Sequence, residues 1–260
     1  MPENQAAADE HWELPSLKYL TFEYLPELEE VQGPIRALEI MYICYCAEIW
    51  QLGTGGGGLG SLKELTLDRC YGLNDNSLPI LTALEQLHIE RCDPSLTYIE
   101  EMDALRELEI HNVTVQNLPD LICLTALQSL IIDAYGESGK ELSDELEYLP
   151  AGFGELGLLK HLELCCLDGL QEMPDLIGLT VLQDLVISDC PKLKRIGKLG
   201  ALLPLKKLEL ENLREFQELP DLCGLTVLKT LRIRNCPELR NLPERIVELT
   251  ALKNLRIHYS

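Results

Sequence analysis

The sequence predicts an α/β solenoid in which stacked coils share one parallel β-sheet, and three observations support this prediction. The pattern Leu-x-x-Leu-x-Leu/Ile occurs eleven times, with Phe22 and Met41 as substitutes in the first two copies. Its first leucines lie 21 to 24 residues apart, except for one gap of 32. Within each copy, apolar residues alternate with other residues, which is the period of a strand that buries one face. Units of this length bury their leucines only by stacking on one another.

Each copy predicts one short strand, and the strands of successive coils are expected to pair in parallel along an inner, concave face. A coil of 21 to 24 residues leaves room outside only for short helical turns or irregular segments. The wider outer spacing then curves the solenoid into a horseshoe. We assign 1–13 to an N-terminal extension and 14–260 to a single domain of about eleven repeats. The first leucines of the copies are Leu17, Leu38, Leu62, Leu84, Leu105, Leu127, Leu159, Leu182, Leu205, Leu228 and Leu252.

Half of the ten cysteines share one place in the repeat, eight residues after its first leucine. Stacking would put these thiols in one buried column, where a small side chain with a weak donor satisfies turn carbonyls without burying a charge. The remaining cysteines lack the spacing of zinc modules, and the five histidines are scattered across different repeats. We therefore expect reduced structural thiols, no metal and no cofactor. The column consists of Cys46, Cys70, Cys92, Cys190 and Cys236.

The glycine-rich stretch LGTGGGGLG at 52–60 raises the possibility of a phosphate-binding loop. Leu52, Leu59 and Leu62, however, have the spacing of the leucines at 242, 249 and 252, so the glycines occupy the outer return of an ordinary coil. A phosphate-binding loop also needs a lysine and a hydroxyl residue after its last glycine, and GxxxxGK[ST] is absent from the sequence. The stretch therefore predicts a return loop and no nucleotide site.

The segment LTVLKTLRIRNCPELRNLPERIVELTAL, residues 225–252, closely matches the repeat LxxLxxLxIxxCxxLxxLPxxIxxL. Over roughly residues 14–260 the chain resembles the leucine-rich repeats of plant intracellular nucleotide-binding leucine-rich-repeat immune receptors. This resemblance implies a cytoplasmic protein-binding domain, which either binds pathogen-derived proteins or holds a nucleotide-binding module inactive. The alternative is a free-standing intracellular leucine-rich-repeat adaptor or scaffold protein.

Several function classes are disfavoured by composition. A formal net charge of -21 repels nucleic acid. The first ten residues lack the features of a signal peptide, and no run of 18 apolar residues predicts a membrane span. No GxSxG or HExxH motif is present, so we expect no enzyme and no catalytic residues.

The repeat register predicts which side chains the concave face displays. Counting each first leucine as position one, these are positions three, five, seven and eight. The first two repeats place Tyr19, Tyr24, Tyr42 and Tyr45 there, either as a partner-binding cluster or as packing that closes the end of the solenoid. The middle of the face is acidic, whereas the last two repeats offer a basic patch whose guanidinium groups would meet the carboxylates of a protein partner. The patch comprises Arg232, Arg234 and Arg256.

The one long gap between repeats exceeds the commonest spacing of 23 by nine residues. The surplus falls within YGESGKELSDELEY, residues 135–148. An acidic helical turn is expected to begin near Ser143. Such insertions lie on the surface of a solenoid and are more often tolerated excursions than binding loops.

Overall fold

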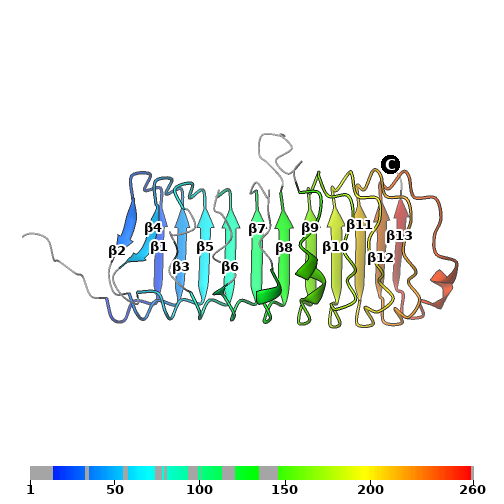
Figure 1. The fold of residues 1–260 in the computed structure, drawn as a ribbon, viewed down its shortest axis with the longest axis horizontal. Coiled ribbons are helices and arrows are strands. Elements are labelled where there is room, and N and C mark those ends of the chain that lie inside the picture. The colour runs from blue at the N-terminus through cyan, green and yellow to red at the C-terminus, as the bar shows by residue number, and fades with distance from the viewer. Residues whose placement is uncertain are drawn as a thin grey trace, which may run out of the picture.

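The computed structural model describes residues 14–32, 35–54, 58–73, 78, 81–92, 99, 101–112, 121–134 and 146–258. Eleven of its strands form one sheet whose spatial order follows the chain, so they stand in a single row in Figure 1. Every neighbouring pair is parallel, and each strand begins two residues after a first leucine. The predicted solenoid is therefore confirmed. The strands are β1 Tyr19–Glu23, β3 Ile40–Cys44, β5 Glu64–Asp68, β6 Gln86–Glu90, β7 Glu107–His111, β8 Ser129–Asp133, β9 His161–Cys165, β10 Asp184–Ser188, β11 Lys207–Glu211, β12 Thr230–Arg234 and β13 Asn254–His258.

Leucines and isoleucines at alternate strand positions build one continuous core along the solenoid. The parallel register aligns equivalent residues, so Leu208 faces Leu231 and Leu210 faces Ile233. The last strand differs, because Leu255 and Ile257 remain 49% and 47% exposed. No strand stacks beyond β13 in the part of the chain that the structure describes. Each inner strand is thus stabilised by burial against both neighbours, and β13 by only one.

The chain leaves nearly every strand through a left-handed turn at position eight. Nine residues there have φ between 49° and 57°. Their backbone N–H groups donate to the carbonyl of the last residue of the next strand, as Tyr24 does to Cys44 and Asn212 to Arg234. The backbone of this turn is therefore uniform, while its side chains vary: Tyr24, Tyr45, Arg69, Arg91, Asn112, Cys166, Asp189, Asn212 and Asn235.

The predicted column of thiols lies directly after this turn. Each of the five sulfurs donates to the carbonyl two residues earlier, at Sγ···O distances from 3.3 to 3.6 Å. Burial raises the pKa of the Cys190 thiol, which keeps it neutral. All ten cysteines are free, and only Cys236 in the column is partly exposed. The structural interpretation of these residues is confirmed.

The outer returns contain short helical turns, as expected, and one feature that was not predicted. The helical turns are 3-10 helices: η2 Leu121–Cys123, η3 Ala151–Glu155 and η4 Glu244–Glu248. The unexpected feature is a second, two-stranded parallel sheet formed by β2 Glu30–Gln32 and β4 Gln51–Thr54. No helix in the described residues is long and apolar enough to cross a membrane.

Three predictions involve residues outside the described ranges. Of the glycine-rich stretch, 55–57 are not described, but Leu52, Leu59 and Leu62 are buried in the core, as the predicted coil register requires. Of the insertion, 135–145 are not described, so the expected turn near Ser143 stays a prediction. The extension at 1–13 is also not described, so its assignment stays a prediction.

Candidate functional site

The outward side chains of the sheet form the candidate site, which we call the open face: the first, third and fifth residues of each of the eleven strands, with the position-eight residues at its edge. Because the strands are parallel and in register, each residue lies beside its equivalents in the neighbouring coils, about 4.8 Å away. Three regions carry candidate functional groups.

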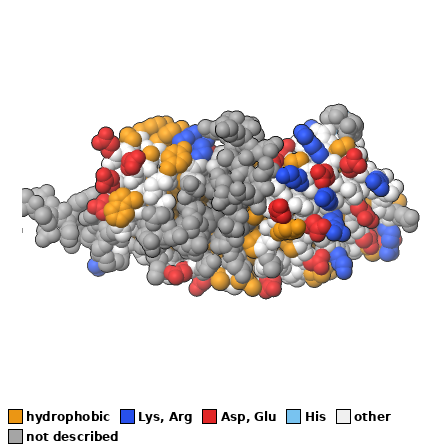
Figure 2. All heavy atoms as spheres, turned by 45° about the horizontal axis from the view of Figure 1, so that its top comes forward, with side chains coloured by type: hydrophobic (Ala, Val, Ile, Leu, Met, Phe, Trp, Pro, Cys, Tyr) orange, Lys and Arg blue, Asp and Glu red, His pale blue; other side chains and the backbone are white. Residues whose placement is uncertain are grey.

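The first region lies at the ends of the N-terminal strands, and Figure 2 shows hydrophobic side chains beside basic ones on that upper edge of the molecule. Tyr24 and Tyr45 stack with ring centroids 4.7 Å apart and an angle of 16° between ring planes. The guanidinium of Arg69 lies 4.3 Å from the centroid of the Tyr45 ring, in a cation–π contact. Three consecutive position-eight side chains thus form one continuous stack.

Only two of the four predicted tyrosines come together. Tyr19 lies at the beginning of β1, five residues before Tyr24, and is 66% exposed. Tyr42 is half-buried in the middle of β3, where a hydrogen bond with Cys44 and burial raise its pKa to about 12. Among the described residues, no ring contact joins either of them to the stack. Tyr24 and Tyr45 therefore pack against each other, and Tyr24 remains 67% exposed.

A buried carboxylate supports this stack from below. Asp68, 7% exposed, accepts a hydrogen bond from Cys44 Sγ at 3.1 Å and pairs with Arg91 Nε at 3.0 Å and Arg69 Nη1 at 3.3 Å. Burial alone would raise the pKa of Asp68, but the hydrogen bond and ion pair with Arg91 lead the contributions that bring it below its ordinary value. The arginine on the Tyr45 ring is thereby held in place by a fixed negative charge.

The second region is the basic end, where the structure pairs two of the three predicted arginines within the chain. Arg232 Nη1 lies 2.9 Å from Glu209 Oε1, and Arg234 Nη1 lies 3.0 Å from Glu211 Oε1. Both acids come from β11, directly opposite the arginines in the register. Arg256 lies opposite Arg232 on the other side, and no ion pair of Arg256 is present among the described residues.

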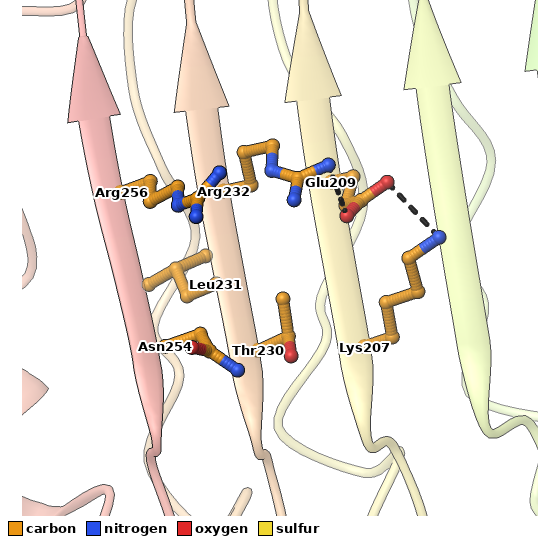
Figure 3. A pocket seen from close by; sticks show the side chains of 7 residues that line it. All are labelled: Lys207, Glu209, Thr230, Leu231, Arg232, Asn254 and Arg256. Carbon is orange, nitrogen blue, oxygen red and sulfur yellow. Dashed lines mark ion pairs between the residues drawn. The ribbon is translucent and has the colours of Figure 1, made fainter.

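Glu209, Arg232 and Arg256 line a hollow of about 390 Å³ on the open face, whereas Arg234 and Glu211 do not. Figure 3 shows Glu209 between Lys207 and Arg232, with Arg256 beyond Arg232. Lys207 Nζ is 3.0 Å from Glu209 Oε2. Three cations against one carboxylate leave a surplus of two positive charges in a chain of net charge -21. Arg232 and Arg256 of the predicted basic patch thus line a partly neutralised hollow. Lys207 lines it as well, although the sequence analysis did not assign Lys207 to the patch.

The third region was missed. His88, Glu109 and His111 lie together on β6 and β7, and the two imidazole centroids are 5.0 Å apart. His88 and His111 do lie in different repeats, but this does not separate them in space, because residues one repeat apart in sequence are neighbours in a solenoid. Listing position five of successive repeats would have put His88 beside Glu109.

Comparisons with known proteins support the fold. No protein-family model matches the chain. Among solved structures, the leucine-rich repeat domain of the type III effector XopL is 21% identical and has a TM-score of 0.61, over 92% of this chain and 76% of that one. The ectodomain of the Arabidopsis thaliana membrane receptor kinase GASSHO1/SCHENGEN3, in complex with CASPARIAN STRIP INTEGRITY FACTOR 2, is 13% identical with a TM-score of 0.48, over 95% of this chain and 38% of that one.

A curated relative is the protein SUPPRESSOR OF npr1-1, CONSTITUTIVE 1 of Arabidopsis thaliana, which is 29% identical over 139 residues. The match covers 53% of this chain and 9% of the relative, so the chain corresponds to a small part of that protein. Sheet topology, repeat register and the likeness to XopL agree: the chain is a leucine-rich-repeat solenoid, an architecture that typically serves as a scaffold for protein interaction.

Proposed function

We propose that this chain is the recognition or autoregulatory leucine-rich-repeat region of a plant intracellular immune receptor and that it binds protein through the open face. The repeat LxxLxIxxC and the partial match to a plant protein support the receptor class. The expected partner is a pathogen-derived protein or another domain of the same receptor. The expected location is the cytoplasm.

The stack of Tyr24, Tyr45 and Arg69, in which the outermost ring, that of Tyr24, is 67% exposed, carries this proposal. All three residues have positive φ, which costs an ordinary L-residue about 1–2 kcal/mol and which asparagine tolerates better. The same turn uses asparagine in three later coils, at Asn112, Asn212 and Asn235. Tyrosine and arginine are enriched at the centres of protein interfaces. A costly backbone position that displays the Tyr24 ring to solvent favours recognition in addition to packing.

The hollow around Arg232 and Arg256 provides a second contact of opposite character. Its surplus positive charge would attract a carboxylate of the partner, and Arg256 is placed to form the bidentate pair. Aromatic contact at one end and charge contact at the other would fix the orientation of the partner along the solenoid.

Affinity capture with the reduced full chain, from the tissue that expresses it, tests the proposal. Y24A/Y45A and R232E/R256E should each reduce recovery of the same partner at least about tenfold, the loss that accompanies a disrupted interface hot spot. The matched control is R195E/R245E, which makes the same charge change at exposed ion pairs with Glu172 and Glu248. Recovery that is unchanged in both open-face variants, or equally reduced in the control, would contradict binding through this face.

A free-standing adaptor or scaffold protein remains the second candidate. The full-length transcript separates the two functions, because a receptor requires a nucleotide-binding module encoded in the same open reading frame. In the receptor, purified nucleotide-binding module should bind the wild-type chain more tightly than the two open-face variants if the domain is autoregulatory. An adaptor would instead bind only separate proteins.

A further inference from the structure

Two histidines and a glutamate on adjacent strands converge on one point of the open face. His88 is the third residue of β6, and its register partner Glu109 is the third residue of β7. His111 follows two residues later on β7, so its side chain points to the same face as Glu109. One ligand atom from each of the three residues lies within 4.8 Å of the other two.

The carboxylate of Glu109 stands between the imidazoles. Its Oε2 atom is 2.8 Å from His88 Nδ1 and 3.6 Å from His111 Nε2. Ligand atoms bound to one tetrahedral zinc ion are about 3.3–3.5 Å apart, as bond lengths of about 2.0–2.2 Å require. The 3.6 Å between Glu109 Oε2 and His111 Nε2 already fits this geometry. A small rotation of the His88 or Glu109 side chain would lengthen the 2.8 Å between Glu109 Oε2 and His88 Nδ1. The three groups are 24% to 37% exposed, which leaves coordination positions open to solvent.

The other nitrogen of each imidazole faces an outer carboxylate. His88 Nε2 is 3.7 Å from Glu90 Oε2, and His111 Nδ1 is 3.9 Å from Asp133 Oδ2. Histidines that bind metals commonly direct their second ring nitrogen to a carboxylate, which fixes the tautomer and strengthens the ligand. Both histidines therefore have one nitrogen toward the point of convergence and the other toward a carboxylate that supports them.

Glu90 is not counted among the ligands, since Arg91 Nη2 holds its Oε1 atom at 2.6 Å. We propose that His88, Glu109 and His111 form a binding site for a divalent transition-metal ion of the zinc class, with solvent completing the coordination. Two imidazoles and one carboxylate are a ligand set that zinc accepts. The site lies between the tyrosine stack and the basic hollow, on the surface proposed to bind protein, but it does not depend on that function.

Binding of Zn²⁺ to the reduced full chain tests the site, provided that the ten thiols are distinguished from the imidazoles. Nitrogen-15 chemical shifts of the histidine rings give this distinction directly. One equivalent of Zn²⁺ should shift the signals of His88 Nδ1 and His111 Nε2 and leave His161 unchanged. His161 is a matched control, because it lies on the same face beside Glu163 and Asp184 without a second histidine. Equal shifts at His161, or no shift at His88 and His111, would overturn the proposal.

Calorimetric titration of variants provides the second measurement. Loss of a carboxylate that only supports a ligand weakens metal binding about 10–100-fold. H88N/H111N removes two ligands and should weaken the first binding step of Zn²⁺ by more than that. E109Q should weaken it by at least about tenfold, and H161N should leave it unchanged. Co²⁺ bound to the wild-type chain should show no thiolate charge-transfer absorption. Unchanged affinity in H88N/H111N, or a thiolate band at the first equivalent, would assign the metal to the cysteines instead and overturn the site.

Discussion

The two halves of the solenoid fill the same turn with different side chains. In the C-terminal half, Asn235 Nδ2 donates to Asn212 Oδ1 and Asn212 Nδ2 to Asp189 Oδ1, both at 2.8 Å. In the N-terminal half, Tyr24, Tyr45 and Arg69 occupy the equivalent positions as a stack. We call these the amide ladder and the aromatic stack.

The comparison separates what the fold needs from what it merely permits. Asparagine suits a left-handed backbone, and its amide links one coil to the next, so the amide ladder combines low strain with hydrogen bonding. Tyrosine and arginine do not suit a left-handed backbone, and Tyr24 exposes its ring to solvent. The amide ladder is therefore the structural solution, and the aromatic stack is the feature that a binding function would explain.

The largest expected effect concerns the thiol column that both halves share. Cys190→Asp should destabilise the protein by about 3–5 kcal/mol, because an unpaired carboxylate would replace a fully buried thiol. Urea unfolding followed by circular dichroism measures this loss. Cys236→Asp is the matched control and should cost less, since Cys236 is partly exposed. Equal losses of stability in the two variants would show that burial of the cysteine does not determine how much the aspartate destabilises the protein.

A smaller effect tests the amide ladder. Asn212→Ala should cost about 1–2 kcal/mol, because it removes two inter-coil hydrogen bonds and places alanine at φ 57°. Asn212→Gly removes the same bonds and adopts that φ without strain, so the difference between the two variants measures the backbone contribution. If both variants unfold at the wild-type urea concentration, the ladder contributes nothing.

The smallest expected effect concerns the acid beneath the aromatic stack. The folded-state pKa of Asp68 is below its ordinary value of 3.8, so its contribution to stability is complete above that pH and is lost as pH falls through the lower folded value. Asp68→Asn cannot titrate. Its unfolding free energy should therefore fall less steeply with acidification below pH 3.8 than that of the wild type. If the unfolding free energy of Asp68→Asn falls with pH as steeply as that of the wild type, the ion pairing assigned to Asp68 is contradicted.

The sequence was sufficient for the sheet, because leucine spacing alone determines which residues point inward. It predicted the start of every coil and the hydrogen-bonding role of the thiols. The parallel pairing of β2 with β4 was missed, since neither segment carries the LxxLxI pattern and the pairing depends on how adjacent returns meet.

The candidate site was predicted less completely, for a related reason. Repeat register places Arg232 beside Glu209, but only side-chain conformation shows that they pair. The group at His88 and His111 was missed because zinc motifs were sought within one loop, whereas a solenoid brings together residues about one repeat apart. Reading the sequence across repeats, position by position, would have placed His88 beside Glu109, but it would not have shown that Arg232 and Glu209 form an ion pair.

Unfolding of two double variants in urea tests the contrast between the halves most directly. Asn212→Ala/Asn235→Ala should lower the free energy of unfolding by at least about 2 kcal/mol. Tyr24→Asn/Tyr45→Asn should change it by less than about 1 kcal/mol, because loss of ring stacking is offset by relief of backbone strain. The opposite order, with the tyrosine variant the less stable, would show that the aromatic stack holds the fold together and would contradict its assignment to recognition.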